Sequence, residues 1–578
     1  MQKLSIWMIC VSFSSPVFAV GENVGNVVGN NPFGVEPGQM LIDRPSAVRP
    51  ELPKYVPQNM PSFKLPPANQ VLKHKDSENM LKIQLNGVKF VGNTVIDEAE
   101  LQAIAKPFVG QAVTLEDLEE LRQKVSQYYL EQGYVNSGAV LPEQKFEHGV
   151  ITMQIIEGKL SEVRVQGTEW LESSYISDRL YNNEDAVLNV NELRENFQML
   201  LLDPLIEQMN GSLLPSSQRG DSILEVNVVR ARPYQVFLTA DNYQPPSIGS
   251  TVGHLGGWVR NLTGLGDMLS GSVAYSEGLI GGSGDYSIPL NAQNTRFNFH
   301  IDRNNTTIVE PTLQPLDIQS RYVNYEFGLT HPVINTLNRN FNVGAAFNYK
   351  KNRTFMLNEP FDFSEGSVNG ITSDSVLRFT LDFTERFEKQ VLSARSTTSV
   401  GINAFNATWH NNPYLPDGDF VSWLGQMQYG AQLFDSDANI VLRGDVQYSD
   451  NKLMPLERFA LGGRYSVRGY RENQLVRDKG YDLSAELRYP VLKGDNEYHL
   501  GTMTLFPFMD YGAAQNRGDR QNIAHLYSIG MGLEWQIIRQ FSTELIYAHA
   551  LNSPPPVPKQ DYDLQDSGFQ WRVNMSAY

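Results

Sequence analysis

The sequence predicts a mainly β protein with a smaller α+β part, in which a 16-stranded transmembrane β-barrel follows two small mixed domains. Three observations predict this class. After residue 232, apolar and polar residues alternate with period 2, as in strands that face lipid on one side and water on the other. Before that point, one order of strands and helices occurs twice. Mean hydropathy is below zero despite 11% aromatic residues, which argues against a helical membrane protein.

Residues 1–19 are predicted to be a secretory signal peptide. Lys3 gives a positive start, residues 4–13 are mostly apolar, and Ala19 is a small residue suited to cleavage. A buried N-terminal helix is the alternative. The only cysteine, Cys10, lies in this segment, so the mature chain is expected to lack disulfides and thiolate chemistry.

The chain is acidic, with a formal net charge of −17, which becomes (47 − 1) − 64 = −18 when Lys3 is removed with the signal peptide. An acidic exported protein is a poor partner for nucleic acid. No run of about 20 apolar residues follows Ala19. If the protein lies in a membrane, we therefore expect it to cross as a closed barrel.

Residues 20–79 form a Pro- and Gly-rich leader or linker without apolar periodicity. This composition predicts an extended or disordered segment, or one that packs irregularly on another part of the protein.

Residues 80–158 and 159–232 are predicted to form two similar domains, each in the order strand, helix, helix, strand, strand. The first strand of each domain ends at a glycine, Gly92 or Gly167. A helix is expected to begin at Thr114 in the first domain, because an apolar stripe follows it and Asp117 lies three residues later. A single α/β domain of about 150 residues is the alternative.

Residues 233–578 are predicted to form the barrel. Leu377 and Phe379 alternate with Arg378 and Thr380, for example. A soluble β-sandwich would also alternate, but full charges on the polar face suit a water-filled lumen better. The 346 residues give about 22 per strand and loop for 16 strands, and about 14 or 18 strands would fit nearly as well.

A long loop is expected between two strong strands, residues 439–449 and 481–491. Loops of about 31 residues in a compact protein are usually functional. The glycines in this loop permit tight backbone turns. The loop contains Phe459-Ala460-Leu461-Gly462-Gly463 and Ser466-Val467-Arg468-Gly469-Tyr470.

This loop and three further features resemble the two-partner secretion transporters (the TpsB family), haemolysin-secretion/activation-type outer-membrane barrels that carry polypeptide-transport-associated (POTRA) domains. Val467-Arg468-Gly469-Tyr470 resembles the hallmark of that superfamily's sixth extracellular loop, and Phe508-Met509-Asp510 resembles its F-x-D strand motif. Residues 241–267, from Asp-Asn-Tyr to Gly-Leu-Gly-Asp, resemble the family's barrel entrance. The tandem domains resemble two periplasmic POTRA domains, and the resemblance covers residues 80–578 in order.

Two features depart from the family pattern. The family commonly has an N-terminal helix that plugs the pore, but residues 20–79 contain no clear amphipathic helix. In the last strand Trp571, Val573 and Met575 form the apolar phase, and the terminal Tyr578 falls in the other phase. The sequence therefore gives no support for a helical plug or for the usual strand ending.

The resemblance implies a contact between the loop and the barrel lumen. Arg468 is expected to meet Asp510, because the family's loop folds back into the barrel and a charged strand residue should face the lumen. A guanidinium in a narrow lumen favours a carboxylate that accepts two hydrogen bonds. Glu486 is the second candidate partner, and an exposed loop arginine of little consequence is the alternative.

The two POTRA-like domains are expected to bind a client chain by strand addition at exposed sheet edges. Tyr128, Tyr129 and Tyr134 are candidate client contacts, and packing in the domain core is the alternative reading of these aromatic residues.

The resemblance implies an outer-membrane pore that recognises a large unfolded partner protein and exports it to the cell surface in two-partner, type V secretion. An adhesin, haemolysin, toxin or haem-acquisition protein would be the client. The alternative is an outer-membrane protein assembly insertase of the same superfamily, which usually carries more POTRA domains. A plugged nutrient receptor would need about 22 strands, too many for this barrel. We expect a monomer that contacts outer-membrane lipid and binds no nucleic acid.

No enzyme activity, cofactor or metal is expected. The chain contains no His-Glu-x-x-His, Gly-x-Ser-x-Gly or phosphate-binding glycine-rich motif. Its nine histidines are scattered without the spacing of metal ligands. An enzyme inside a barrel is the remaining alternative.

Overall fold

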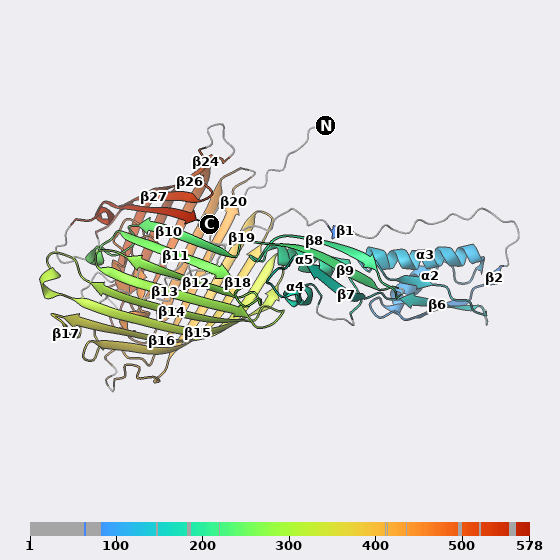
Figure 1. The fold of residues 1–578 in the computed structure, drawn as a ribbon, viewed down its shortest axis with the longest axis horizontal. Helices are drawn as coiled ribbons and strands as arrows, with labels where there is room; N and C mark the ends of the chain where they lie inside the picture. The colour runs from blue at the N-terminus through green and yellow to red at the C-terminus, as the bar shows by residue number, and fades with distance from the viewer. Residues whose placement is uncertain are drawn as a thin grey trace. The chain divides into compact units, whose positions relative to one another are not determined.

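The structure, a computed structural model, describes residues 63–64, 82–145, 148–181, 186–218, 220–410, 412, 414–434, 436–494, 500–519, 522–553 and 562–577. They form two compact units, an N-terminal unit that ends at Arg232 and a barrel that begins at Pro233 (Figure 1). The predicted signal peptide and Tyr578 lie outside the described residues, as does the predicted leader apart from Phe63 and Lys64.

The first half of the N-terminal unit is a three-stranded sheet with two helices. The strand order is β3-β6-β5, with β3 parallel and β5 antiparallel to β6. Leu118, Leu121 and Val125 of the longer helix are fully buried in the core. The elements are β2 (Ile83–Gln84), β3 (Gly87–Val91), α2 (Glu98–Ala105), β4 (Ala112–Val113), α3 (Leu115–Glu131), β5 (Gly138–Val140) and β6 (Val150–Ile156).

Helix α3 begins where the sequence predicts. Asp117 N–H donates to Thr114 Oγ1 at 3.3 Å, and Thr114 N–H donates to Asp117 Oδ2 at 2.7 Å, which completes a capping box. The Thr114 backbone N–H and hydroxyl together lower the pKa of the Asp117 carboxyl. The helix ends at Glu131, and Gly133 follows with a φ of 93°.

The single strand that the sequence predicts before Gly92 is wrong, because residues 83–91 form two strands with different partners. β2 pairs with β4, whereas β3 pairs with β6. Between them, Leu85 N–H donates to Gln111 O at 3.0 Å and Asn86 Nδ2 donates to His148 O at 2.8 Å. These bonds hold the chain where it passes from the β2–β4 ladder to the β3–β6 ladder. A period-2 apolar pattern does not show such a change of strand partner.

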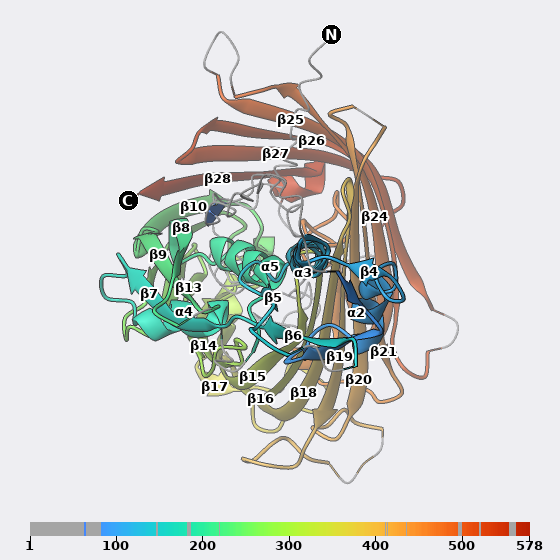
Figure 2. The ribbon, with the colours of Figure 1, turned by 90° about the vertical axis from the view of Figure 1, so that its right-hand side faces the viewer.

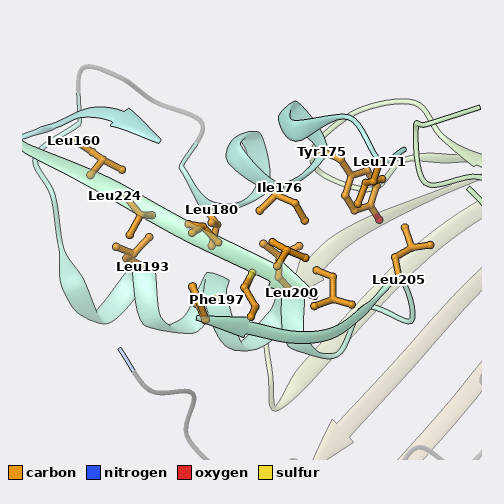
Figure 3. Packing of buried hydrophobic residues seen from close by; sticks show 14 of the residues in the cluster. Leu160, Leu171, Tyr175, Ile176, Leu180, Leu193, Phe197, Leu200, Leu205 and Leu224 are labelled. Carbon is orange, nitrogen blue, oxygen red and sulfur yellow. The ribbon is translucent and has the colours of Figure 1, made fainter. Parts of the chain in front are cut away.

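The second half of the N-terminal unit repeats this architecture. Its strand order is β1-β8-β9-β7, and Leu193, Phe197 and Leu200 pack in its core (Figure 3). The short strand β1 adds to the edge of β8 in parallel. The elements are β1 (Phe63–Lys64), β7 (Leu160–Gln166), α4 (Ser173–Leu180), α5 (Val190–Leu201), β8 (Ile206–Pro215) and β9 (Ser222–Arg230).

A glycine follows the first core strand of each half at an equivalent position. Gly92 has a φ of 98° and Gly167 a φ of 79°, which favour glycine. A Cβ on Gly92 would lie 2.6 Å from Ile155 O, and one on Gly167 would lie 2.2 Å from Val228 O. Both carbonyls belong to the last strand of their half, so the same close backbone approach is built twice. The two halves also have separate hydrophobic cores.

Sixteen antiparallel strands form a closed barrel, as the sequence predicts (Figure 2). β10 pairs with β28 to close the ring, and the two-residue β17 (Glu359–Pro360) is an arm on the tip of β16. The strands are β10 (Tyr234–Asp241), β11 (Val252–Arg260), β12 (Met268–Tyr275), β13 (Leu279–Pro289), β14 (Arg296–Thr307), β15 (Gln319–Asn335), β16 (Arg339–Met356), β18 (Ile371–Arg386), β19 (Gln390–Gly401), β20 (Val421–Gln432), β21 (Asn439–Ser449), β24 (Lys479–Leu492), β25 (Thr502–Gln515), β26 (Ala524–Ile538), β27 (Phe541–Ala550) and β28 (Phe569–Ala577).

The two faces of the barrel wall alternate along each strand. On β26, Ile529 and Met531 are 51% and 53% exposed, whereas Glu534 is 6% exposed. The apolar phase therefore forms the outer surface of the barrel and the charged phase faces the lumen. Within the described parts of the chain, no helix is long and apolar enough to cross a membrane.

The connections differ in length between the two ends of the barrel. At the end where β10 begins, the turns are as short as residues 336–338 and 539–540, whereas loops at the other end reach residues 450–478. In outer-membrane barrels the short turns are periplasmic and the long loops are extracellular. The chain therefore enters the barrel at its periplasmic end.

Candidate functional site: a loop inside the barrel lumen

The loop between β21 and β24 lies against the inner wall of the barrel. Residues 450–478 include a hairpin of β22 (Phe459–Leu461) and β23 (Leu475–Arg477), which the sequence did not predict. Phe459, Leu461 and Val467 are completely buried. They pack with Leu424, Ala514 and Leu526 of the barrel strands. The loop is therefore attached to the barrel wall by a hydrophobic cluster.

Arg468 is almost completely buried, at 1% exposure, and is held by two carboxylates. Its Nε and Nη2 donate to the two oxygens of Asp510 on β25, each at 2.7 Å. Nη1 donates to Glu486 Oε1 on β24 at 2.7 Å, and Nη2 donates to Ser484 Oγ at 3.0 Å. The guanidinium carbon lies 3.4 Å from the centre of the Phe508 ring. The structure thus brings together the arginine and both acidic residues that the sequence singled out.

Glu486 accepts hydrogen bonds from three arginines. Besides Arg468, Arg443 Nη1 donates to Oε1 at 2.8 Å and Arg488 Nη1 donates to Oε2 at 3.0 Å. Arg488 also reaches Glu534 at 2.5 Å. Sequence reasoning did not find Arg443 and Arg488, because they lie outside any contiguous motif and only the strand register brings them together.

The residues beside Arg468 fix the loop by other means. Val467 packs in the hydrophobic cluster between the loop and the wall. Gly469 has a φ of 91°, and a Cβ there would lie 3.0 Å from Ala548 O on β27. Tyr470 Oη donates to Tyr527 O on β26 at 3.0 Å. The tetrad therefore contacts β26 and β27 in addition to β24 and β25.

The same loop reaches the opposite wall. Glu457 is completely buried and accepts from Arg378 Nη2 on β18 at 2.7 Å. Lys350 Nζ on β16 lies 3.4 Å from its Oε1. β18 is the eighth strand of the ring and β27, which Gly469 approaches, is the fifteenth, so these two contacts lie nearly half a turn apart. The loop therefore crosses the lumen rather than covering one side of it.

The three tyrosines proposed as client contacts occupy different environments. Tyr129 is completely buried in the first core, and its Oη donates to Glu157 at 3.0 Å. Tyr129 therefore packs in the domain core, which is the alternative that the sequence left open for these aromatic residues. Tyr128 and Tyr134 are partly buried against that core. Tyr128 Oη donates to Glu100 at 3.0 Å.

The chain is similar in sequence and in fold to known proteins. HuxB of Haemophilus influenzae, a haem/haemopexin transporter, is 25% identical over 82% of this chain and 84% of its own length. The structure of CdiB from Escherichia coli superposes with a TM-score of 0.68 at 18% identity, over 89% of this chain and 94% of that one. The structure of BamA from Haemophilus ducreyi lacking POTRA domains 1–3 shares the fold with a TM-score of 0.52 at 13% identity, over 86% of this chain and 100% of that one.

Family comparison gives the assignment. Residues 83–158 match the ShlB-type POTRA domain. Residues 220–535, more than half of the chain, match the haemolysin secretion/activation proteins ShlB/FhaC/HecB. The chain therefore belongs to the ShlB/FhaC/HecB family of outer-membrane, two-partner secretion transporters.

Proposed function

We propose that this chain recognises one large unfolded partner protein in the periplasm and passes it through the barrel to the cell surface. The observation that carries this proposal is the loop inside the lumen. It is attached to the wall by ion pairs and hydrogen bonds around Arg468, Asp510 and Glu486, which can exchange partners when the loop moves. A structural plug would need no such dense set of exchangeable contacts.

The N-terminal unit supplies the recognition surface in this proposal. β8 already accepts an added strand, because Phe63 lies opposite Gly211 and Lys64 opposite Ser212 in a parallel pair. The edge of β8 thus accepts an extended segment, and a client that displaces β1 would gain affinity from backbone hydrogen bonds that do not demand one client sequence. Binding of a short extended segment would be of about micromolar strength or weaker, since the segment must be ordered.

The client class follows from the relatives. Their names describe a haem/haemopexin transporter, a haemolysin transporter and the CdiB transporters. For this chain we propose a large secreted adhesin, haemolysin, toxin or haem-acquisition protein. The barrel would act as a monomer, with its apolar face in outer-membrane lipid, and without catalysis or a cofactor.

The decisive experiment deletes this chain and measures two outputs in the same strain. Loss of one large secreted protein, preferably one encoded beside this gene, with unchanged levels of other outer-membrane barrels, is the expected result. A general fall in outer-membrane barrels with normal secretion would instead support the insertase, with which this fold is shared.

A further inference from the structure

The seam between the first and last barrel strands carries a second polar cluster, separate from the one around Arg468. It joins three wall strands to the loop. Its members are Asp241 of β10, Tyr243 just after it, Glu544 of β27, Arg572 of β28, and Arg464 and Tyr465 of the loop.

Three charges lie in one row across this seam. Glu544 is directly opposite Arg572 in the β27–β28 ladder, and Arg572 is directly opposite Asp241 in the β28–β10 ladder. Arg572 Nε lies 3.5 Å from Asp241 Oδ2. All three residues face the lumen, and their signs alternate, as favourable cross-strand pairs require. The row alone nevertheless has two carboxylates for one guanidinium.

The seam has few backbone pairs to close it. Within the described strands, six residue pairs join β10 and β28, against seven for β27–β28 and eight for β10–β11. Asp241–Arg572 is the last of the six. Beyond it, Trp571 N–H donates to Asn242 Oδ1 at 2.8 Å, and Asn242 Nδ2 donates to Phe569 O at 3.0 Å. Asn242 N–H also donates to Trp571 O at 3.2 Å, so the backbone and the side chain of Asn242 together extend the seam where the ladder ends.

The loop completes the row from inside the lumen. Arg464 donates two hydrogen bonds to Glu544, at 2.9 and 2.8 Å, which supplies the missing cation. Tyr243 Oη donates to the same carboxylate at 2.8 Å. Arg572 Nη2 donates to Tyr465 Oη at 2.6 Å, and the rings of Tyr243 and Tyr465 meet edge to face at 6.1 Å.

We propose that Arg464 and Tyr465 are positioning residues that couple the place of the loop to the closure of the barrel. Withdrawal of the loop removes a cation from Glu544 and an acceptor from Arg572, and a buried charge left without its partner is strongly unfavourable. The seam therefore weakens when the loop leaves. Conversely, a seam that loosens gives up part of the loop's attachment.

This anchor is distinct from the one around Arg468, which is attached to β24 and β25. The inference relies on the proposed function only for the statement that the loop moves. Its test can therefore fail while the Arg468 anchor still holds, and the reverse is also possible.

The test measures hydrogen–deuterium exchange by mass spectrometry on the full-length barrel in detergent. Tyr465→Phe removes one hydroxyl and keeps the ring, and Arg464→Gln removes the cation. We expect backbone amides of β10 and β28 to exchange roughly tenfold faster in Tyr465→Phe, and faster still in Arg464→Gln. Tyr481→Phe, the same change on a wall tyrosine that is 40% exposed, should leave β10 and β28 unchanged.

Arg468→Gln provides the second comparison. It should raise exchange in the loop, with a smaller effect on β10 and β28 than Arg464→Gln has. The coupling is overturned if β10 and β28 exchange at the wild-type rate in both seam variants, or if Arg468→Gln opens the seam as much as Arg464→Gln. Heat-modifiable migration on gels checks that each variant still forms a closed barrel, and Tyr465→Phe keeps the test decisive if Arg464→Gln does not fold.

Discussion

At the scale of single residues, Arg468 is the side chain whose loss should affect export most. Arg468→Ala leaves Asp510, itself 3% exposed, without its cation, at a cost of about 1–3 kcal/mol. At about 1.4 kcal/mol per tenfold, this shifts the loop between positions by about tenfold or more. We expect secretion to fall strongly while surface levels of the barrel stay normal. Arg468→Lys should also be impaired, because an ammonium cannot donate the paired bonds.

A double-mutant cycle identifies the partner of Arg468. Asp510→Ala should give a similar defect, and the double variant should be much less than additive, because both changes break one contact. Glu486 binds the same guanidinium, so some coupling should remain with that residue. Arg471→Ala is the matched control in the same loop, since its pair with Asp566 is more exposed and of smaller value. Normal secretion by Arg468→Ala would show that the contact of Arg468 with Asp510 and Glu486 does not control export.

A glycine on the neighbouring strand also supports this arginine. Gly530 lies opposite Phe508, and a Cβ there would come within 2.4 Å of both the Phe508 ring and Tyr547 O. Gly530→Ala should therefore displace the Phe508 ring, and with it Arg468, from the barrel wall. Secretion and the thermal stability of the barrel should fall together. Gly253→Ala is the control, because a Cβ at that exposed position would meet nothing within 4 Å. Equal secretion by the two variants would contradict this role of Gly530.

The sequence predicts individual charges better than it predicts their partners. Period 2 places Asp510 and Glu486 on the lumen face, and the family resemblance pairs Arg468 with Asp510. Glu544 and Arg572, by contrast, come from β27 and β28, and their meeting with the loop depends on strand register and on the path of a long loop. Neither the strand register nor the path of the loop is encoded in a short motif.

At the scale of elements, the N-terminal halves should supply recognition and not the membrane seal. Deleting residues 80–158 or 159–232 should abolish client secretion while the barrel still inserts, because the ring closes within residues 234–577. The two halves also contact each other, since Val190 N–H donates to Gly133 O at 2.9 Å. Secretion, surface barrel and client binding are measured together. Normal secretion after either deletion would refute this role.

A helix or strand can be predicted from the sequence when the residues that determine it lie within one segment. Helix α3 could be predicted because its cap and its apolar stripe lie within one segment. The barrel strands could be recognised from alternation, but their number could not be fixed, since about 14 or 18 would have fitted the length as well. The β22–β23 hairpin was missed because each strand has three residues and is held by the barrel wall.

At the scale of the whole molecule, the source of energy for export can be inferred. The chain contains no nucleotide-binding motif, and the loop crosses the lumen between β18 and the strands near the seam. We therefore expect the client to enter as an extended chain and to be drawn outward by folding at the cell surface. The loop across the lumen leaves less room for a folded domain than for an extended chain.

A stably folded domain fused into the client should therefore stall export. The fusion protein should remain accessible from the periplasm and should keep the pore occupied, so that secretion of unmodified client falls in the same cells. A destabilised variant of the same domain, equal in length and charge, is the control and should be exported, because it can unfold before it enters the lumen. Surface exposure of both fusions is measured by protease digestion of intact cells. Export of the stable fusion at the rate of its destabilised variant would show that the barrel admits folded protein, and the requirement for an unfolded client would then be wrong.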